Sequence, residues 1–104
     1  MDIIRDPVEN GQVVLHVSGD MDADSAYRVP EEVAALFEQE RPPEIVVDLS
    51  QVSFLDSVGL GMLVRAQDEA LANDASFRLR APSEPVSRVL SITAMDTHFA
   101  VLPG

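Results

Sequence analysis

The sequence has 104 residues, of which 46 % are apolar and 5 % aromatic, with neither Trp nor Cys. A chain of this length forms one domain and buries roughly two-thirds of its unfolded surface, so its core must come from Val, Leu, Ile, Ala and Met. The missing Cys excludes disulfides, thiol catalysis and zinc–thiolate sites, and the formal net charge of −11 disfavours binding to nucleic acid and to anionic lipid.

The N-terminal stretch MDIIRDPVEN is acidic and lacks the basic start and the apolar segment of a signal peptide. No apolar run approaches the about 18 residues that a membrane span requires. We therefore expect a soluble, cytoplasmic protein without membrane insertion.

The first part of the chain predicts a hairpin. Residues 1–6 are typical of a short strand, and Asn10-Gly11 favours a tight turn because both residues tolerate a positive φ. Residues 12–19 alternate in character, which is typical of a strand with one face in the core. The expected core face of that strand carries Val13, Leu15 and Val17.

A helix and a buried strand are expected next. Within residues 20–40, apolar side chains have helical spacing, at Val29, Val33, Leu36 and Phe37. Pro30 suits the first turn of this helix, and the prolines at 42–43 end it. The continuous apolar run EIVVDL, at 44–49, is typical of a central buried strand.

The remaining elements complete an alternating pattern. We expect a helix at 57–72, a strand at 76–80, a shorter helix within 82–92 that Ser83 caps, and a last strand at 97–102. The order β-β-α-β-α-β-α-β predicts an α/β fold. Its mixed sheet would have four to five strands, right-handed crossovers and helices mainly on one face.

An acidic run after the second expected strand has the ligand spacing of an EF-hand loop. The matching carboxylates are Asp20, Asp22, Asp24 and Glu31. The sixth position, which needs Gly for a sharp turn, holds Ser25, and a strand rather than a helix comes before the run. These departures favour an acidic turn that leads into a helix, and we expect no metal site.

Signals of catalysis are weak. His16 lies on the polar side of its strand and His98 is near the C-terminus. Ser57 is not in a G-x-S-x-G elbow, because the residue two before it is Leu55. No phosphate-binding G-x-x-x-x-G-K-[ST] loop is present, and the seven basic residues do not cluster. We expect a protein that is not an enzyme, with no catalytic residue and no cofactor.

The stretch FLDSVGLGML, at 54–63, carries the most informative pattern. Asp56 follows a buried strand and is placed to cap the next helix, so Ser57 lies in the first turn, where free N–H groups favour an anion. Gly59 and Gly61 leave the backbone open to another surface. The alternative is a capped helix whose glycines serve close packing, and spacing alone does not separate the two.

Helix geometry favours the first interpretation. At about 100° per residue, five residues share the face expected to enter the core: Leu60, Leu63, Val64, Gln67 and Leu71. The opposite face carries Val58, Met62, Arg65 and Glu69. Apolar side chains on a water-facing turn beside Ser57 indicate a docking surface.

Three stretches resemble the STAS domain of bacterial anti-sigma factor antagonists: VVLHVSGDMDADSA, EIVVDLSQVSFLDSVGLGMLVRA and FRLRAPSEPVSRVLSITAMDTHFAVL. The resemblance covers nearly the whole chain, and D-S-x-G-L-G after a D-L-S strand is its most specific part. It implies a single STAS domain over residues 1–104, folded as a β/α sandwich.

The resemblance also implies a partner-switching regulator of transcription in the stress response. In that family the unphosphorylated domain binds an anti-sigma factor that is also a serine kinase, and so frees the sigma factor. Phosphorylation of the motif serine ends the binding, and a metal-dependent serine phosphatase restores it. Carried over, Ser57 is the phosphoacceptor, and Asp56 and the Asp22 of the GDMD turn lie near it.

The expected partner-binding residues are the exposed part of the motif helix: Val58, Gly59, Gly61, Met62 and Arg65. Many relatives have a second serine where this chain has Val58, so Ser57 is the only acceptor in the motif. A phosphoserine adds about −1.5 to −2 charge, and burying that charge in an interface costs several kcal/mol unless it is paired.

Two alternatives remain open. One is a STAS-domain subunit of a lipid-transport or stress-signalling complex, in which Ser57 belongs only to a helix cap. The other is a small-molecule or nucleotide-binding domain, which the missing phosphate loop disfavours.

Overall fold

The computed structural model describes residues 1–103, which form a five-stranded sheet in the order β1-β2-β3-β4-β5. The elements in chain order are β1 (Asp2–Arg5), β2 (Gln12–Met21), α1 (Arg28–Gln39), β3 (Glu44–Leu55), α2 (Ser57–Ala72), β4 (Ser76–Arg80), α3 (Glu84–Ile92), a short 3₁₀ helix η1 (Met95–Thr97) and β5 (Ala100–Leu102). β1 is antiparallel to β2, and every later pair is parallel. The predicted α/β order is confirmed, with η1 added before the last strand.

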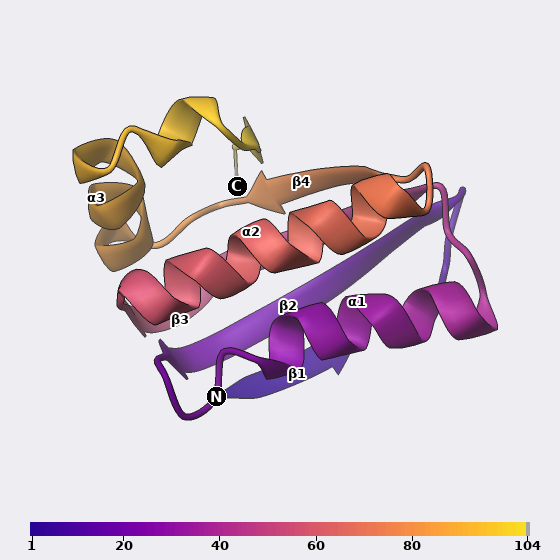
Figure 1. Ribbon diagram of the computed structural model, residues 1–104, viewed down its shortest axis with the longest axis horizontal. Coiled ribbons are helices and arrows are strands. Elements are labelled where there is room, and N and C mark those ends of the chain that lie inside the picture. The colour runs from indigo at the N-terminus through magenta and orange to yellow at the C-terminus, as the bar shows by residue number, and fades with distance from the viewer. Residues whose placement is uncertain (104) are drawn as a thin grey trace.

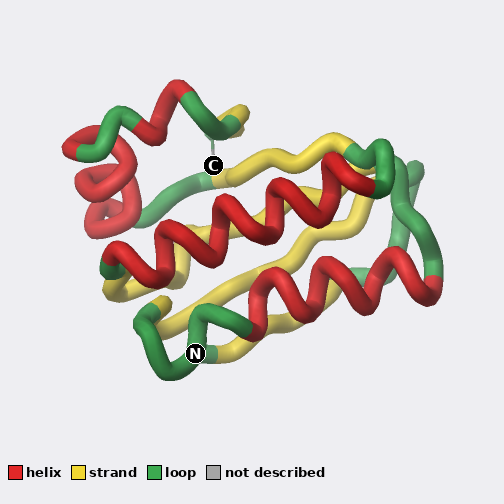
Figure 2. Tube along the Cα trace, viewed as in Figure 1, coloured by secondary structure: helices red, strands yellow, loops and turns green. Residues whose placement is uncertain are grey.

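Helices α1 and α2 lie side by side in front of the sheet and run in the same direction (Figure 1). Figure 2 shows both as red coils over the yellow strands, with α3 set apart beyond the carboxyl end of β4. Because both helices follow parallel strands, their N-termini meet at the end of the sheet where β2 and β3 finish. This arrangement brings the acidic turn and the motif helix together.

The hairpin between β1 and β2 forms as predicted. Asn10 and Gly11 have φ values of 53° and 77°, and the backbones of Glu9 and Gln12 exchange two hydrogen bonds of 2.9 Å. The expected core face of β2 is buried throughout. Val14, on the opposite face of β2, is also buried, and it lies beside Val46 of β3.

β3 is longer than predicted and contains two irregularities. β3 has one extra residue opposite the step from His16 to Ser18 of β2. It has another opposite the step from Gly19 to Asp20. Such bulges break the alternation of side chains, so the buried residues after Leu49 are Val52 and Leu55. The same bulges leave Phe54 48 % exposed at the end of the strand.

The bounds of α2 match the prediction, but its core face does not. The residues buried against the core are Gly59, Leu63, Ala66 and Ala70. Of the expected core residues, Leu63 is buried, and Leu60 and Val64 pack partly against the core. Leu71 is 57 % exposed, because the buried face is turned by about a quarter turn from the expected one. Small side chains explain the difference, since Gly and Ala allow the helix to approach the strands closely.

The core face of α1 is as expected, with its four predicted apolar residues buried. At α3, Ser83 occupies the cap position, but its hydroxyl donates to the Val52 carbonyl at 2.6 Å and makes no cap hydrogen bond. Ser83 therefore ties α3 to β3 instead of capping its own helix. No helix within residues 1–103 is long and apolar enough to cross a membrane.

Candidate functional site

The carboxyl ends of β2 and β3 bring two predicted site residues to one edge of the sheet. Met21, the last residue of β2, pairs with Leu55, the last residue of β3. Asp22 and Asp56 therefore come directly after neighbouring strand ends. The Asp56 N–H donates to the Met21 carbonyl at 3.4 Å, which joins the two strand ends. The predicted neighbourhood of the acidic turn and the motif helix is thus present in the fold.

Asp56 caps α2 as the sequence predicts. Its backbone is extended, with φ −102° and ψ −176°, and its carboxylate accepts a hydrogen bond of 2.8 Å from the Gly59 N–H. Ser57 is the first residue of α2 and its side chain is exposed. The hydroxyl is therefore held on a rigid helix end and is open to another protein.

The two glycines of the motif have different roles. Gly59 is buried, and a β-carbon there would overlap the Met21 carbonyl oxygen and lie 2.7 Å from Leu55 Cδ1. The space beside Gly59 is filled by the chain's own β2, so the expectation that a partner approaches the backbone there is wrong. A β-carbon at Gly61 would meet nothing within 4 Å, and the partner role of Gly61 stays a prediction.

The acidic run forms a compact turn before α1. Asp22 Oδ1 accepts from the Asp24 N–H at 3.1 Å and from the Ser25 hydroxyl at 2.9 Å. Asx turns of this kind hold the backbone in place. The spacing that resembles an EF-hand loop therefore belongs to a helix entry, with Glu31 exposed on α1.

The outward side of α2 carries the remaining predicted partner residues. Val58 is 41 % exposed, as expected, and Arg65 is exposed. Met62 is half-buried and packs against the core, so it is less open than its helical position predicted. The reason is α1, whose first turns line a groove together with Met62.

A groove between α1 and α2 runs next to these residues. We call it the α1–α2 groove; its volume is about 330 Å³, and it is lined by Tyr27, Pro30, Glu31, Ala34, Met62, Arg65 and Glu69. Tyr27 is 50 % exposed at its mouth. The sequence analysis did not single out Tyr27, although it is the one Tyr in a chain with few aromatic residues.

The edge that holds Ser57 is strongly acidic. Asp20, Asp22, Asp24 and Asp56 all lie in or beside the turns at the ends of β2 and β3. The ion pairs found within residues 1–103 involve other carboxylates: Asp6, Glu44, Asp48 and Glu84. A further negative charge at Ser57 would therefore join carboxylates that form no ion pair within residues 1–103.

One buried carboxylate of the D-L-S strand supports the sheet rather than the site. Asp48 Oδ2 accepts from Arg80 Nε at 3.0 Å and Nη2 at 2.9 Å. Its Oδ1 accepts from the Ser50 N–H at 2.9 Å and hydroxyl at 2.7 Å. Burial alone would raise the pKa of Asp48, but the hydrogen bonds from Ser50 and Arg80 outweigh it and hold that pKa below its usual range.

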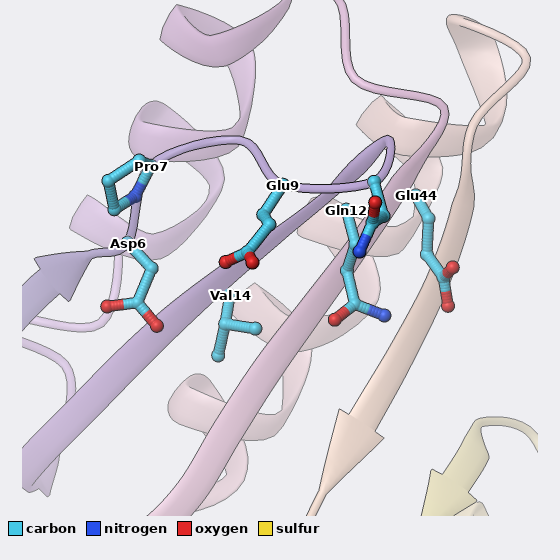
Figure 3. Close-up of a pocket in the computed structure, with 7 residues that line it drawn as sticks. Asp6, Pro7, Glu9, Gln12, Val14 and Glu44 are labelled. Atoms are coloured by element: carbon cyan, nitrogen blue, oxygen red, sulfur yellow. The ribbon is translucent and has the colours of Figure 1, made fainter.

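A second hollow lies beside the β1–β2 hairpin, at the opposite end of β2 from Asp22. Its volume is about 310 Å³, and Asp6, Glu9 and Glu44 contribute carboxylates to it (Figure 3). One of these, Glu44, lies 3.3 Å from Arg78 Nε. Within residues 1–103 no group of three or more side chains is arranged to hold a metal ion, and we assign this hollow no binding role.

Comparison with known proteins agrees with this geometry. A family model described as "Mlab, STAS domain" matches residues 5–103. The anti-sigma-B factor antagonist of Staphylococcus epidermidis is 35 % identical over 92 residues, which cover 86 % of this chain and 82 % of that protein. This chain belongs to the STAS-domain family of anti-sigma factor antagonists.

Other relatives place this STAS domain in the same group. The anti-sigma-F factor antagonist RsfB of Mycobacterium tuberculosis is 31 % identical over 90 residues, which cover 86 % of this chain and 72 % of that protein. The crystal structure of an anti-sigma factor antagonist from Mycobacterium paratuberculosis matches with a TM-score of 0.83 and 28 % identity, covering 99 % of this chain and 86 % of the other. The predicted STAS fold is confirmed.

Proposed function

We propose that this STAS domain is an anti-sigma factor antagonist that phosphorylation of Ser57 switches off. The unphosphorylated domain binds an anti-sigma factor with serine kinase activity, and the sigma factor is released. A metal-dependent serine phosphatase then reverses the modification. The observation that carries the proposal is the exposed Ser57 hydroxyl on the capped first turn of α2, beside the exposed Val58.

The charges around Ser57 supply a physical basis for the switch. A phosphate on Ser57 adds about −1.5 to −2 charge beside Asp56, at an edge that also holds Asp22. The N-terminus of α2 offsets part of this charge, and an exposed side chain can carry it without disturbing the core. A partner that covers the first turn would have to remove water from the dianion, which costs several kcal/mol unless the charge is paired.

The proposed docking surface consists of Val58, Gly61, Met62 and Arg65 on α2. Val58 and Met62 are one helical turn apart and supply apolar area, while Gly61 lets the partner approach the backbone. Gly59 contributes from beneath, because it allows α2 to pack on the end of β2. Ser57 lies at one end of this surface, so its modification acts directly on the interface.

Binding of Ser57 variants to anti-sigma factors tests the proposal. Each purified anti-sigma factor kinase of the source organism is titrated with the wild-type domain, Ser57→Ala and Ser57→Asp in a calorimeter. We expect Ser57→Ala to bind with and without ATP, and Ser57→Asp to bind at least tenfold more weakly. Ser91→Asp is the matched control, since it adds the same charge on the exposed side of α3.

Mass spectrometry of the domain after incubation with kinase and ATP should locate one phosphate, on Ser57. Equal affinities of Ser57→Ala and Ser57→Asp would contradict the switch. Together with an unmodified Ser57 in cells, that result would favour the second candidate, a STAS domain that packs into a lipid-transport or stress-signalling complex without phosphorylation. Val58 in place of the second serine is the residue that favours this candidate.

A further inference from the structure

The α1–α2 groove continues the apolar surface next to Ser57. Val58 lies one turn before Met62 on α2, and Met62 forms part of the groove wall. The facing wall comes from the entry and the first turns of α1, with Tyr27, Pro30 and Ala34. A partner that covers Val58 therefore meets the mouth of the groove without leaving the surface of the domain.

The groove has the properties of an anchor pocket for one large apolar side chain. Its volume of about 330 Å³ is at the lower end of the range for small-molecule pockets. Half-exposed Tyr27 and the flexible Met62 are residue types that contribute strongly to protein interfaces. The groove is open to solvent along one side, so an anchor side chain contacts its walls while the partner itself covers the open side, as at binding hot spots.

The charges at the groove define what must flank that apolar side chain. Glu31 of α1 and Glu69 of α2 stand on the two walls, against the single cation Arg65. The whole chain carries a formal net charge of −11. Complementary charge promotes encounter and excludes like-charged partners, so an occupant with Lys or Arg beside its apolar anchor fits, and an acidic one does not.

We propose that the α1–α2 groove receives a segment of the anti-sigma factor in which a large apolar side chain is flanked by basic residues. This inference rests on the proposed function, because it assigns a second contact to the same partner. Ser57 and Val58 form the part of the interface that phosphorylation controls. The groove forms the part that selects the partner by its charge, and its wall on α1 lies outside the motif helix.

Substitutions at Ala34 test the proposal, because this half-buried helical residue lines the groove but is remote from the motif in sequence. Ala34→Arg and Ala34→Glu fill the groove with side chains of similar length and opposite charge, and both residues favour helix. We expect Ala34→Arg to weaken anti-sigma factor binding at least tenfold in calorimetry. Ala34→Glu should bind at least five times more tightly than Ala34→Arg.

A second pair of variants tests charge without added bulk. Glu69→Gln removes a groove carboxylate, and Asp68→Asn removes the neighbouring exposed carboxylate that does not line the groove. We expect a two- to fivefold loss of affinity and a shallower salt dependence for Glu69→Gln, and less than a twofold change for Asp68→Asn. Thermal unfolding followed by circular dichroism checks that all four variants are folded.

The outcomes separate this inference from the proposed function. If Ser57→Asp abolishes binding while the Ala34 and Glu69 variants bind as the wild type does, the groove proposal alone is overturned. Equal affinities of Ala34→Arg and Ala34→Glu overturn the basic character of the occupant. If no anti-sigma factor binds the wild-type domain, both proposals are overturned.

Discussion

The first turn of α2 has two sides that differ in what constrains them. On the inner side, Gly59 touches the Met21 carbonyl and the Leu55 side chain, and nothing larger than hydrogen fits. On the outer side, Ser57 and Val58 are exposed and Gly61 has open space beside it. The inner side fixes the position of the helix end, which leaves the outer side free to change its charge and its contacts.

Matched glycine substitutions should produce the largest difference between the two sides. Gly59→Ala places a methyl group against backbone that cannot move aside, and we expect a loss of about 2–3 kcal/mol in unfolding free energy. Gly61→Ala enters open space in a helix, where Ala is favoured by about 0.5–1 kcal/mol. Urea unfolding of both variants measures this, and equal stabilities would show that the inner side is not constrained by packing.

Asp48 lies in β3, one of the strands on which the inner side of α2 packs. Replacing it by Asn leaves Arg80 without its carboxylate, and we expect a loss of about 2 kcal/mol at pH 7. Because the folded pKa of Asp48 lies below its ordinary value of 3.8, its contribution is present above that value and is lost as the pH falls through the folded pKa.

Urea unfolding of the wild type and Asp48→Asn between pH 7 and pH 3 checks this dependence. The difference in unfolding free energy between the wild type and Asp48→Asn should be largest at neutral pH and should become smaller below about pH 4. Glu84→Gln is the control, since its pair with Arg88 is exposed and contributes less than about 1 kcal/mol. A gap that stays constant with pH would show that the Asp48 carboxylate does not stabilise the fold through its charge.

Val58→Asp should have the smallest effect on stability and still a clear effect on binding. The side chain is 41 % exposed, so we expect the unfolding free energy to change by no more than about 0.5 kcal/mol. Affinity for the anti-sigma factor should fall at least tenfold, which corresponds to about 1.4 kcal/mol. Unchanged binding would remove Val58 from the docking surface and leave the outer side without its apolar contact.

Local signals in the sequence were sufficient for much of the fold. The pair Asn10-Gly11, which tolerates a positive φ, predicted the hairpin, and apolar spacing predicted the buried face of α1. The bounds of α2 also match those expected at 57–72. Asp56 was recognised as a cap because the chemistry of capping involves residues three apart. These features depend on neighbours in the chain, and so they are visible in the sequence.

Features that depend on distant segments were not visible. The core face of α2 was misassigned because helical periodicity weighs large apolar residues, whereas close packing on the sheet selected Gly59, Ala66 and Ala70. The extension of β3 beyond Leu49 and its two bulges exist only in its pairing with β2. Ser83 fits the pattern of a cap, yet its hydroxyl binds the carbonyl of Val52, 31 residues away in the chain.

The sequence by itself determined the order of the elements, the capped turn that presents Ser57 and the family. Only the tertiary structure decided which motif glycine is free, where Met62 lies and that Tyr27 faces α2 across a groove. The physical reason is that caps, turns and periodicity act within a few residues. Whether a surface position is open depends on which other segment packs beside it, and that is set when the whole chain folds.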